Sequence, residues 1–191
     1  LTPLSPWTAD LSIASTDNSC SVDNALFKKI QENSAVKAAY GRMIAYDVPV
    51  TVNGEQKKID LVSYEQHQFE WAKDYLLEGS LDSVQNQADT GLVVYEPENT
   101  IEMGNAVTLD IGGKSSKIQI SGILSSSSFK NNNDTGIIIC SEETFRQLTG
   151  ESNYAILDIQ LNRNATDAEV NEIKQIAGTS YTISDDRMDN S

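Results

Sequence analysis

The sequence has few of the residues that metal and redox sites use most. It contains one histidine and two cysteines among 191 residues. Cys20 and Cys140 form no CxxC pair, and neither lies near His67, so their spacing gives no support to a zinc or redox motif. We therefore expect no cofactor and no bound metal.

Long hydrophobic runs are also missing. No stretch of about eighteen apolar residues could form a membrane-spanning helix, and no charged and apolar leader marks a signal peptide. The chain opens on Leu1 rather than on methionine and ends in the polar tail DDRMDNS. We expect a fragment of a longer polypeptide whose membrane segments lie outside it.

Positive charge is scarce, with 14 Lys and Arg against 28 Asp and Glu and a formal net charge of -14. Such a surface repels a phosphate backbone, and no Lys/Arg cluster offsets it, which argues against nucleic acid and anionic lipid as direct partners. The 39% of hydrophobic residues is typical of a folded chain. The length allows one large domain or two small subdomains.

The two ends of the chain show the same order of elements. Alternating apolar residues predict a strand over residues 10–14, and apolar residues at helical spacing predict a helix over residues 22–33. Near the C-terminus, a strand over residues 155–161 precedes a helix that Thr166 and Glu169 begin with a capping box. That helix runs to Ala177, Gly178 ends it, and residues 181–183 form the closing strand of a β-α-β unit.

Residues 36–64 predict a β-hairpin. Extended character over residues 36–52, broken by Gly41, leads to Asn53-Gly54, a pair that accepts the positive φ angles of a tight turn. Residues 59–64 form the return strand. Apolar and aromatic residues at helical spacing then predict a helix over residues 66–78, with Gly79 as its C-terminal cap.

The middle third changes to short β segments separated by Gly, Asn and Ser turns. In the ribbon IEMGNAVTLDIGGKSSKIQISGIL, alternating apolar residues flank a Gly112-Gly113 turn, which predicts a hairpin with Val107 and Ile120 in the core. Ser141 then caps a short helix that ends at Gly150. The predicted β segments are residues 91–96, 106–111, 117–124 and 136–140.

The loop over residues 125–135 is long, polar and without regular pattern, and such loops carry function more often than the elements they connect. We expect it to bind a protein partner, through Ser125, Ser128, Phe129, Asn131 and Asn133.

The end of this loop also matches part of a calcium-loop frame. In NNNDTGIIICSE, Asn131, Asn133 and Thr135 stand at positions one, three and five, with Gly136 at six and Glu142 at twelve. The first ligand is not an aspartate and no pair of helices flanks the segment, so a flexible polar loop is the better interpretation.

Candidates for catalysis are weak. His67 is the one imidazole, with Glu65 and Glu70 as its nearest carboxylates, and is better explained as a solvated residue at a helix start. No serine stands in GxSxG or SxxK. The pair Asp185-Asp186 and the group Glu96, Glu98 and Glu102 could pair as acid and base, but surface solvation is the simpler reading. We expect no catalytic residues.

The order of five segments, LLEGS, GLVVYE, IEMGNAVTL, KIQISGIL and GIIICSEETFRQL, resembles the MacB-like extracytoplasmic core domain of FtsX-type ABC-transporter permeases. The similarity runs from about residue 10 to residue 186 and includes the closing helix ATDAEVNEIKQIAG. The resemblance implies a domain inserted between two transmembrane helices. It also implies an α+β fold in which a discontinuous α/β subdomain from both chain ends carries an inserted β-rich subdomain.

This resemblance sets the predicted organisation and function. Residues 1–78 and 151–191 would form the membrane-proximal α/β subdomain, and residues 79–150 the β-rich insertion. The domain would lie on the extracytoplasmic face of the bacterial plasma membrane, as part of an integral membrane protein. It would engage a partner protein or exported substrate and couple it mechanically to a cytoplasmic ATPase, which fits the absence of a Walker A sequence. The alternative is a stand-alone secreted hydrolase or carbohydrate-binding domain that uses surface carboxylates.

Two geometric expectations follow from the predicted organisation. Cys20 and Cys140 should be unpaired, because they fall in different subdomains. The first and last strands should lie in the same subdomain, with both chain ends leaving it on one face.

Overall fold

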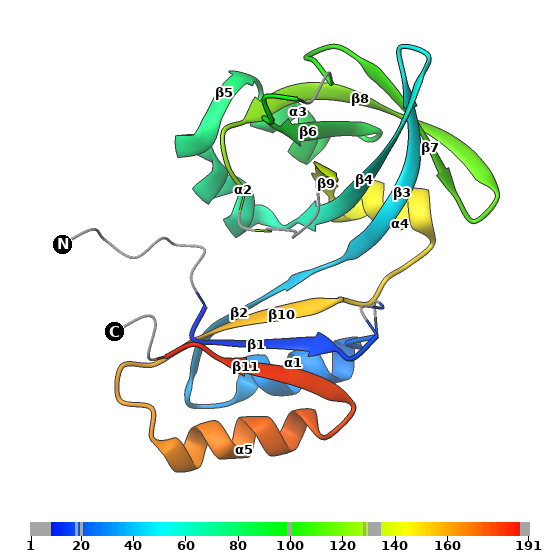
Figure 1. Ribbon diagram of the computed structural model, residues 1–191. Helices are drawn as coiled ribbons and strands as arrows, with labels where there is room; N and C mark the ends of the chain where they lie inside the picture. Colours follow the sequence, from blue (N-terminus) through cyan, green and yellow to red (C-terminus); the bar gives the residue numbers. More distant parts are fainter. Residues whose placement is uncertain are drawn as a thin grey trace. The chain divides into compact units, whose positions relative to one another are not determined.

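The structure, a computed structural model, describes residues 9–17, 19, 21–98, 101–127, 129 and 135–187. The chain divides into two compact units, which are Leu1–Met43 with Ser152–Ser191, and Ile44–Glu151 (Figure 1). A discontinuous first unit interrupted by a second is the arrangement expected from the sequence. The first segment ends at Met43, earlier than the expected boundary at residue 78.

The first unit contains a four-stranded antiparallel sheet with the strand order β11-β1-β10-β2. Each helix connects two strands that run parallel to each other with a third strand between them. This is the split β-α-β arrangement of ferredoxin-like folds. Its elements are β1 (Leu11–Ser15), α1 (Asn24–Glu32), β2 (Val36–Arg42), β10 (Ile156–Leu161), α5 (Asp167–Ala177) and β11 (Tyr181–Asp185).

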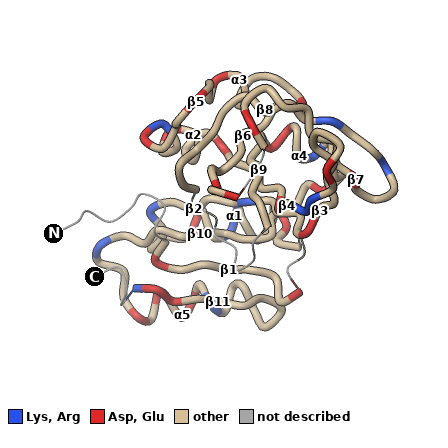
Figure 2. Tube along the Cα trace, turned by 45° about the horizontal axis from the view of Figure 1, so that its top comes forward, with Lys and Arg blue, Asp and Glu red and all other residues tan. Residues whose placement is uncertain are grey.

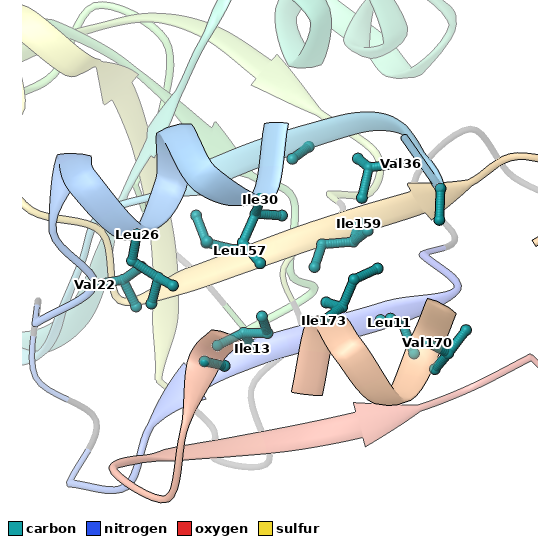
Figure 3. Close-up of a cluster of buried hydrophobic side chains, with 13 residues drawn as sticks. Leu11, Ile13, Val22, Leu26, Ile30, Val36, Leu157, Ile159, Val170 and Ile173 are labelled. Atoms are coloured by element: carbon teal, nitrogen blue, oxygen red, sulfur yellow. The ribbon is translucent and has the colours of Figure 1, made fainter. Parts of the chain in front are cut away.

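Helices α1 and α5 pack on one face of this sheet and close a single apolar core (Figure 3). Leu26 and Ile30 of α1 and Val170 and Ile173 of α5 are buried against the apolar residues of β1 and β10. The capping box of α5 forms as predicted, because Thr166 accepts from the backbone of Glu169 and the Glu169 carboxylate accepts from the backbone of Thr166.

The second unit contains a seven-stranded sheet with the order β5-β8-β6-β9-β4-β3-β7, and β7 also pairs with β8. That last pairing closes six of the strands into a barrel-like sheet, with β5 attached outside the ring. Its elements are β3 (Ile44–Val52), β4 (Glu55–Tyr64), α2 (Gln66–Ala72), the 3-10 turn η1 (Lys73–Tyr75), β5 (Leu76–Gly79), α3 (Leu81–Asn86), β6 (Thr90–Val94), β7 (Ala106–Ile111), β8 (Lys114–Leu124), β9 (Gly136–Ser141) and α4 (Glu142–Thr149).

Both predicted glycine hairpins are present. Asn53 and Gly54 have φ angles of 51° and 78° between β3 and β4, and Gly112 and Gly113 have 59° and 78° between β7 and β8. Positive φ at both central residues is the backbone of a type I′ turn, which matches the twist of the strands it joins.

The helix predicted over residues 66–78 is too long. The α-helix ends at Ala72, and Leu76–Gly79 form the strand β5, which pairs with the last residues of β8. Helical spacing continues through this segment, but pairing with a distant strand overrides a local preference. The following helix, α3, was not predicted. The Ser80 side chain caps it by accepting a hydrogen bond from the backbone N–H of Ser83.

The unit boundary lies earlier than expected because β4 is one of the strands of the barrel-like sheet. It pairs in parallel with β9, from Ile59 opposite Gly136 to Tyr64 opposite Ser141, and its last six residues are all buried. Parallel neighbours far apart in sequence leave no local signal for the boundary.

None of the helices in the part of the chain that the structure describes is long and apolar enough to cross a membrane.

Candidate partner-binding site

The surface loop predicted to bind a partner starts at the end of β8 and borders a hollow of about 270 Å³ in the second unit. We call it the first hollow. It lies where β6 and β8 end and β9 begins, so residues from three neighbouring strands meet around it. Its lining residues are Val94, Tyr95, Glu96, Ser125, Ser126, Ser127, Phe129 and Ile137.

Hydrogen bonds and one aromatic contact hold the start of the loop in place. The backbone N–H of Ser125 donates to the Tyr75 carbonyl oxygen over 2.8 Å, and the Ser125 hydroxyl donates to the same oxygen. The Ser127 hydroxyl donates to the Phe129 carbonyl oxygen. The Phe129 ring is buried edge-on against Tyr46, with 6.1 Å between ring centroids.

The predicted partner-binding residues therefore differ in position. Ser125 is exposed and Phe129 is 7% exposed, so within this pair the serine faces solvent and the phenylalanine anchors the loop. Both line the first hollow. Ser128, Asn131 and Asn133 lie outside the described residues. Partner binding through this loop stays a prediction.

A second hollow of about 500 Å³ adjoins the first, and Glu96 lines both. Both lysine and glutamate residues line it. Its lining residues are Lys57, Lys58, Ile59, Glu96, Pro97, Glu98, Ile101 and Gly136. The mixture of charges suits polar contacts with a protein surface more than a buried small molecule.

The sequence reading missed Lys57, Lys58 and Tyr95 as part of this region. Tyr95 is 57% exposed directly after β6, and its backbone N–H donates to Leu124 at the end of β8. The apolar runs in β4 and β6 predict buried strands. They do not show that the ends of these strands meet.

Of the acid and base candidates, Asp185 forms ion pairs with two cations. Arg187 donates two hydrogen bonds to Asp185, over 2.7 Å and 2.9 Å, and these hold the pKa of that carboxyl well below its usual range. Lys174 also donates to Asp185. A general acid must keep its proton near neutral pH, which these cations oppose.

His67 occupies the first turn of α2, and its ring is 63% exposed and contacts the Glu65 carboxylate. This is the solvated helix-start position expected from the sequence. Cys140 is a free cysteine inside β9, where burial raises the pKa of its thiol. Cys20 lies outside the described residues, so its pairing state stays a prediction.

Metal ligation has no support in the described residues. They contain no group of three or more His, Cys, Asp or Glu side chains that could hold an ion. Four positions of the calcium-loop frame, residues 131–134, lie outside them. The twelfth-position residue, Glu142, begins α4 and lies 3.8 Å from Arg146. Asp and Glu residues are spread over elements of both units (Figure 2).

The sheet of the first unit brings the two ends of the described chain together. Strands β1 and β11 pair along their lengths, with Leu11 opposite Asp185 and Ser15 opposite Tyr181. The backbone N–H of Asp186 donates to the carbonyl oxygen of Asp10 over 2.9 Å. The chain therefore enters and leaves this unit at adjacent positions, as predicted.

The two connections to the second unit leave from the opposite end of the same sheet. Arg42, the last residue of β2, pairs with Ile156, the first residue of β10. Ile156 also pairs with Ala14, at the end of β1 that lies away from the entry point. One end of the sheet thus carries the chain ends, and the other carries both connections to the inserted unit.

This combination, a ferredoxin-like unit interrupted between its second and third strands by a barrel-like unit, is a fold that the chain shares with solved extracytoplasmic domains of ABC transporters. The structure is similar to the periplasmic region of MacB from Actinobacillus actinomycetemcomitans, with a TM-score of 0.61 and 9% identity, over 93% of this chain and 89% of that one.

Two further solved structures share the fold. The extracellular domain of the noncanonic ABC-type transporter YknZ from Gram-positive bacteria matches with a TM-score of 0.59 and 12% identity, over 91% of this chain and 98% of that one. A domain of a Porphyromonas gingivalis protein assigned as a permease matches with a TM-score of 0.55 and 13% identity, over 97% and 98%. At these identities the likeness is one of fold.

No protein-family model matches the sequence, and no curated protein matches it. The likeness to permease domains is therefore carried by the arrangement of the elements, because identities of 9% to 13% preserve few individual residues.

Proposed function

We propose that this chain is the extracytoplasmic domain of an ABC-transporter permease, located at the outer face of the bacterial plasma membrane as part of an integral membrane protein. Its fold resembles a periplasmic region and an extracellular domain of such transporters over more than nine tenths of the chain. In this role the domain binds a partner protein or exported substrate and transmits conformational change. ATP hydrolysis belongs to another domain or chain.

The observation that carries the proposal is the pairing of β1 with β11. Because the two chain ends leave the same end of one sheet, helices that continue from them would be joined through a backbone hydrogen-bond ladder. A displacement of either helix would move the sheet as a rigid element, and a displacement of the sheet would move both helices. Such coupling is reciprocal, so partner binding outside the membrane and ATP-driven motion inside it would influence each other.

The loop after β8 is the partner contact that we propose for the second unit. Ser125 is exposed beside the first hollow, and the loop starts from a fixed position because Ser125 and Phe129 are both anchored. A fixed start and an exposed polar surface allow binding without rearrangement of the barrel. Exported substrate or a partner protein could occupy this surface in the same transporter.

An insertion in the full-length transporter tests the mechanical role. About six Gly and Ser residues are placed directly after Arg187, which gives the chain a flexible link instead of a direct continuation from β11. The matched control places the same insertion in the exposed turn at Gly112 and Gly113. ATP hydrolysis and transport are both measured in proteoliposomes.

We expect the insertion after Arg187 to abolish the dependence of ATP hydrolysis on the extracytoplasmic partner or substrate, while basal hydrolysis continues. The control should retain this dependence. Unchanged coupling in the Arg187 insertion, with intact transport, would show that force does not pass through this connection.

A further inference from the structure

Strand β5 stands apart from the closed ring of the second unit. Among the described residues it has one sheet neighbour, β8, and it lies at the end of the strand order (Figure 1). Each strand of the ring formed by β8, β6, β9, β4, β3 and β7 instead has a neighbour on both sides for at least part of its length. A sheet edge with one free side can receive an additional strand from another chain.

Apolar side chains are exposed along this edge. Leu77 is 60% exposed and Met103 is 39% exposed, and they account for two of the four large hydrophobic residues that are exposed in the described chain. Leu77 lies at a register shift between Leu76 and Glu78, so it is left out of the pairing with β8.

Gly79 adjoins both apolar residues, Met103 in space and Leu77 along the strand. The Met103 sulfur lies 2.9 Å from the place that a Cβ on Gly79 would occupy, so Met103 covers the glycine at the end of β5. Leu77 is two residues before Gly79 on the same strand. We call Leu77, Glu78, Gly79, Glu102 and Met103 the β5 edge patch.

Acidic residues belong to the β5 edge patch and flank β5 in the sequence. Glu78 and Glu102 belong to it and are exposed, and Asp74 and Asp82 flank β5 in the chain and are exposed as well. Lys73, the lysine nearest to β5 in the sequence, donates to the Glu70 carboxylate over 2.8 Å. The edge therefore combines apolar contact area with an excess of negative charge.

We propose that the β5 edge patch docks an extended, basic segment of a partner protein. Apolar side chains of that segment contact Leu77 and Met103, and its Lys or Arg side chains lie beside Glu78 and Glu102. The segment adds to the sheet next to β5. Charge selects this occupant over a second copy of the chain, because the formal net charge is -14 and two copies would bring their acidic edges together. The proposal concerns the second unit alone and holds whether or not the chain transmits force.

A binding experiment with the folded 191-residue chain tests this. The probe is a fluorescent synthetic peptide of about ten residues that alternates Lys and Val, a pattern that suits an extended strand. Two peptide controls are used, one with Glu in place of each Lys and one with the same composition in separate Lys and Val blocks. Fluorescence anisotropy gives the dissociation constant, and sedimentation velocity of the chain alone gives its oligomeric state.

Three substitutions locate the binding surface. Leu77→Arg and Glu78→Lys each place a positive charge at the β5 edge patch, and both alter exposed side chains, which preserves the fold. Asp110→Lys makes the same charge reversal as Glu78→Lys at an exposed position of β7 and serves as the matched control. Circular dichroism and the midpoint of thermal unfolding verify that each variant is folded.

We expect the alternating basic peptide to bind at least about tenfold more weakly to Leu77→Arg and Glu78→Lys than to the parent, and to bind Asp110→Lys within about twofold of the parent. The acidic and block peptides should bind much more weakly to the parent. The proposal is overturned if the basic peptide does not bind, if the two edge variants bind as tightly as Asp110→Lys, or if the parent chain is a dimer that Leu77→Arg dissociates.

Discussion

At the scale of single residues, hydrogen-bond partners decide what a carboxylate does in this acidic chain. Asp185 accepts from Arg187 and Lys174, while Glu169 accepts from the backbone at the start of α5. Both act on the structure of the first unit, one at the end of β11 and the other at a helix cap. The sequence predicted the partner of Glu169 in the capping box, but it did not predict that Arg187 and Lys174 would both donate to Asp185.

The bidentate pair of Asp185 and Arg187 predicts a pH-dependent stability. The pKa of Asp185 is lowered from its ordinary value of 3.8, mainly by the hydrogen bonds from the Arg187 side chain. Its stabilising contribution is therefore present above pH 3.8 and is lost as the pH falls toward the folded-state pKa. We expect Asp185→Asn to be less stable than the parent near neutral pH, with the difference shrinking below about pH 4.

Urea unfolding at a series of pH values measures this difference. Asp110→Asn removes an exposed carboxylate from β7 and controls for the change in net charge. A constant gap between Asp185→Asn and the parent down to strongly acidic pH would contradict the assignment.

The alternation in the β7–β8 ribbon predicts which residues carry the barrel core. Val107 and Ile120 are 0% and 1% exposed. Aspartate at either position would bury an unpaired charge, so Val107→Asp and Ile120→Asp should each lower the free energy of unfolding by more than about 3 kcal/mol. Gln119→Asp, at an exposed position of β8, is the control. Chemical denaturation measures all three, and parent-like stability of both core variants would refute the burial assignment.

At the scale of elements, the same helical pattern produced both a helix and a strand. Residues 66–72 form α2, and η1 then ends the helix before β5 turns along β8. The decisive residue is Gly79, because a Cβ there would lie 2.1 Å from the Ser121 carbonyl oxygen. The glycine that reads as a helix cap in the sequence is the residue that lets two strands approach.

Gly79→Ala should therefore destabilise the fold much more than an ordinary glycine substitution does. Gly79 has a φ angle of 87° and no space for a Cβ, whereas Gly112 has a φ angle of 59° and nothing within 4 Å of such an atom. We expect Gly112→Ala to cost about 1 kcal/mol of backbone strain and Gly79→Ala at least about 2 kcal/mol more. Thermal and urea unfolding of the pair measure this, and equal losses would show that the β5–β8 approach is not tight.

At the scale of the whole molecule, the first unit has the parts of an independent domain. Among its described residues, thirteen buried apolar residues from before residue 44 and after residue 151 form one cluster. Arg42 pairs with Ile156, so the two ends left by removing the inserted unit are neighbours in the sheet. A short loop could join them as a hairpin.

We predict that the first unit folds alone when residues 44–151 are replaced by about four Gly and Asn residues. Because both helices and all four strands of its sheet remain, far-ultraviolet circular dichroism and a single cooperative thermal transition should report a folded domain. The same shortened chain with Leu157→Asp should not fold, since Leu157 is 0% exposed in this core. A shortened chain that melts without cooperativity would show that the first unit depends on the second.

The sequence by itself determined the elements whose signals are local. The capping box at Thr166, the turns at Asn53 and Gly112 and the alternation in β7 and β8 involve residues within a few positions of each other, and each formed as predicted. The resemblance of five ordered segments also indicated the fold.

Tertiary structure decided what depends on residues far apart in the chain. The parallel pairing of β4 with β9 moved the unit boundary to Met43, and pairing with β8 turned residues 76–79 into β5. Within the candidate site, Phe129 became an anchor because Tyr46, more than eighty residues earlier, lies against it. Strand pairing and burial are set by contacts between distant segments, and periodicity within one segment contains no information about its neighbour.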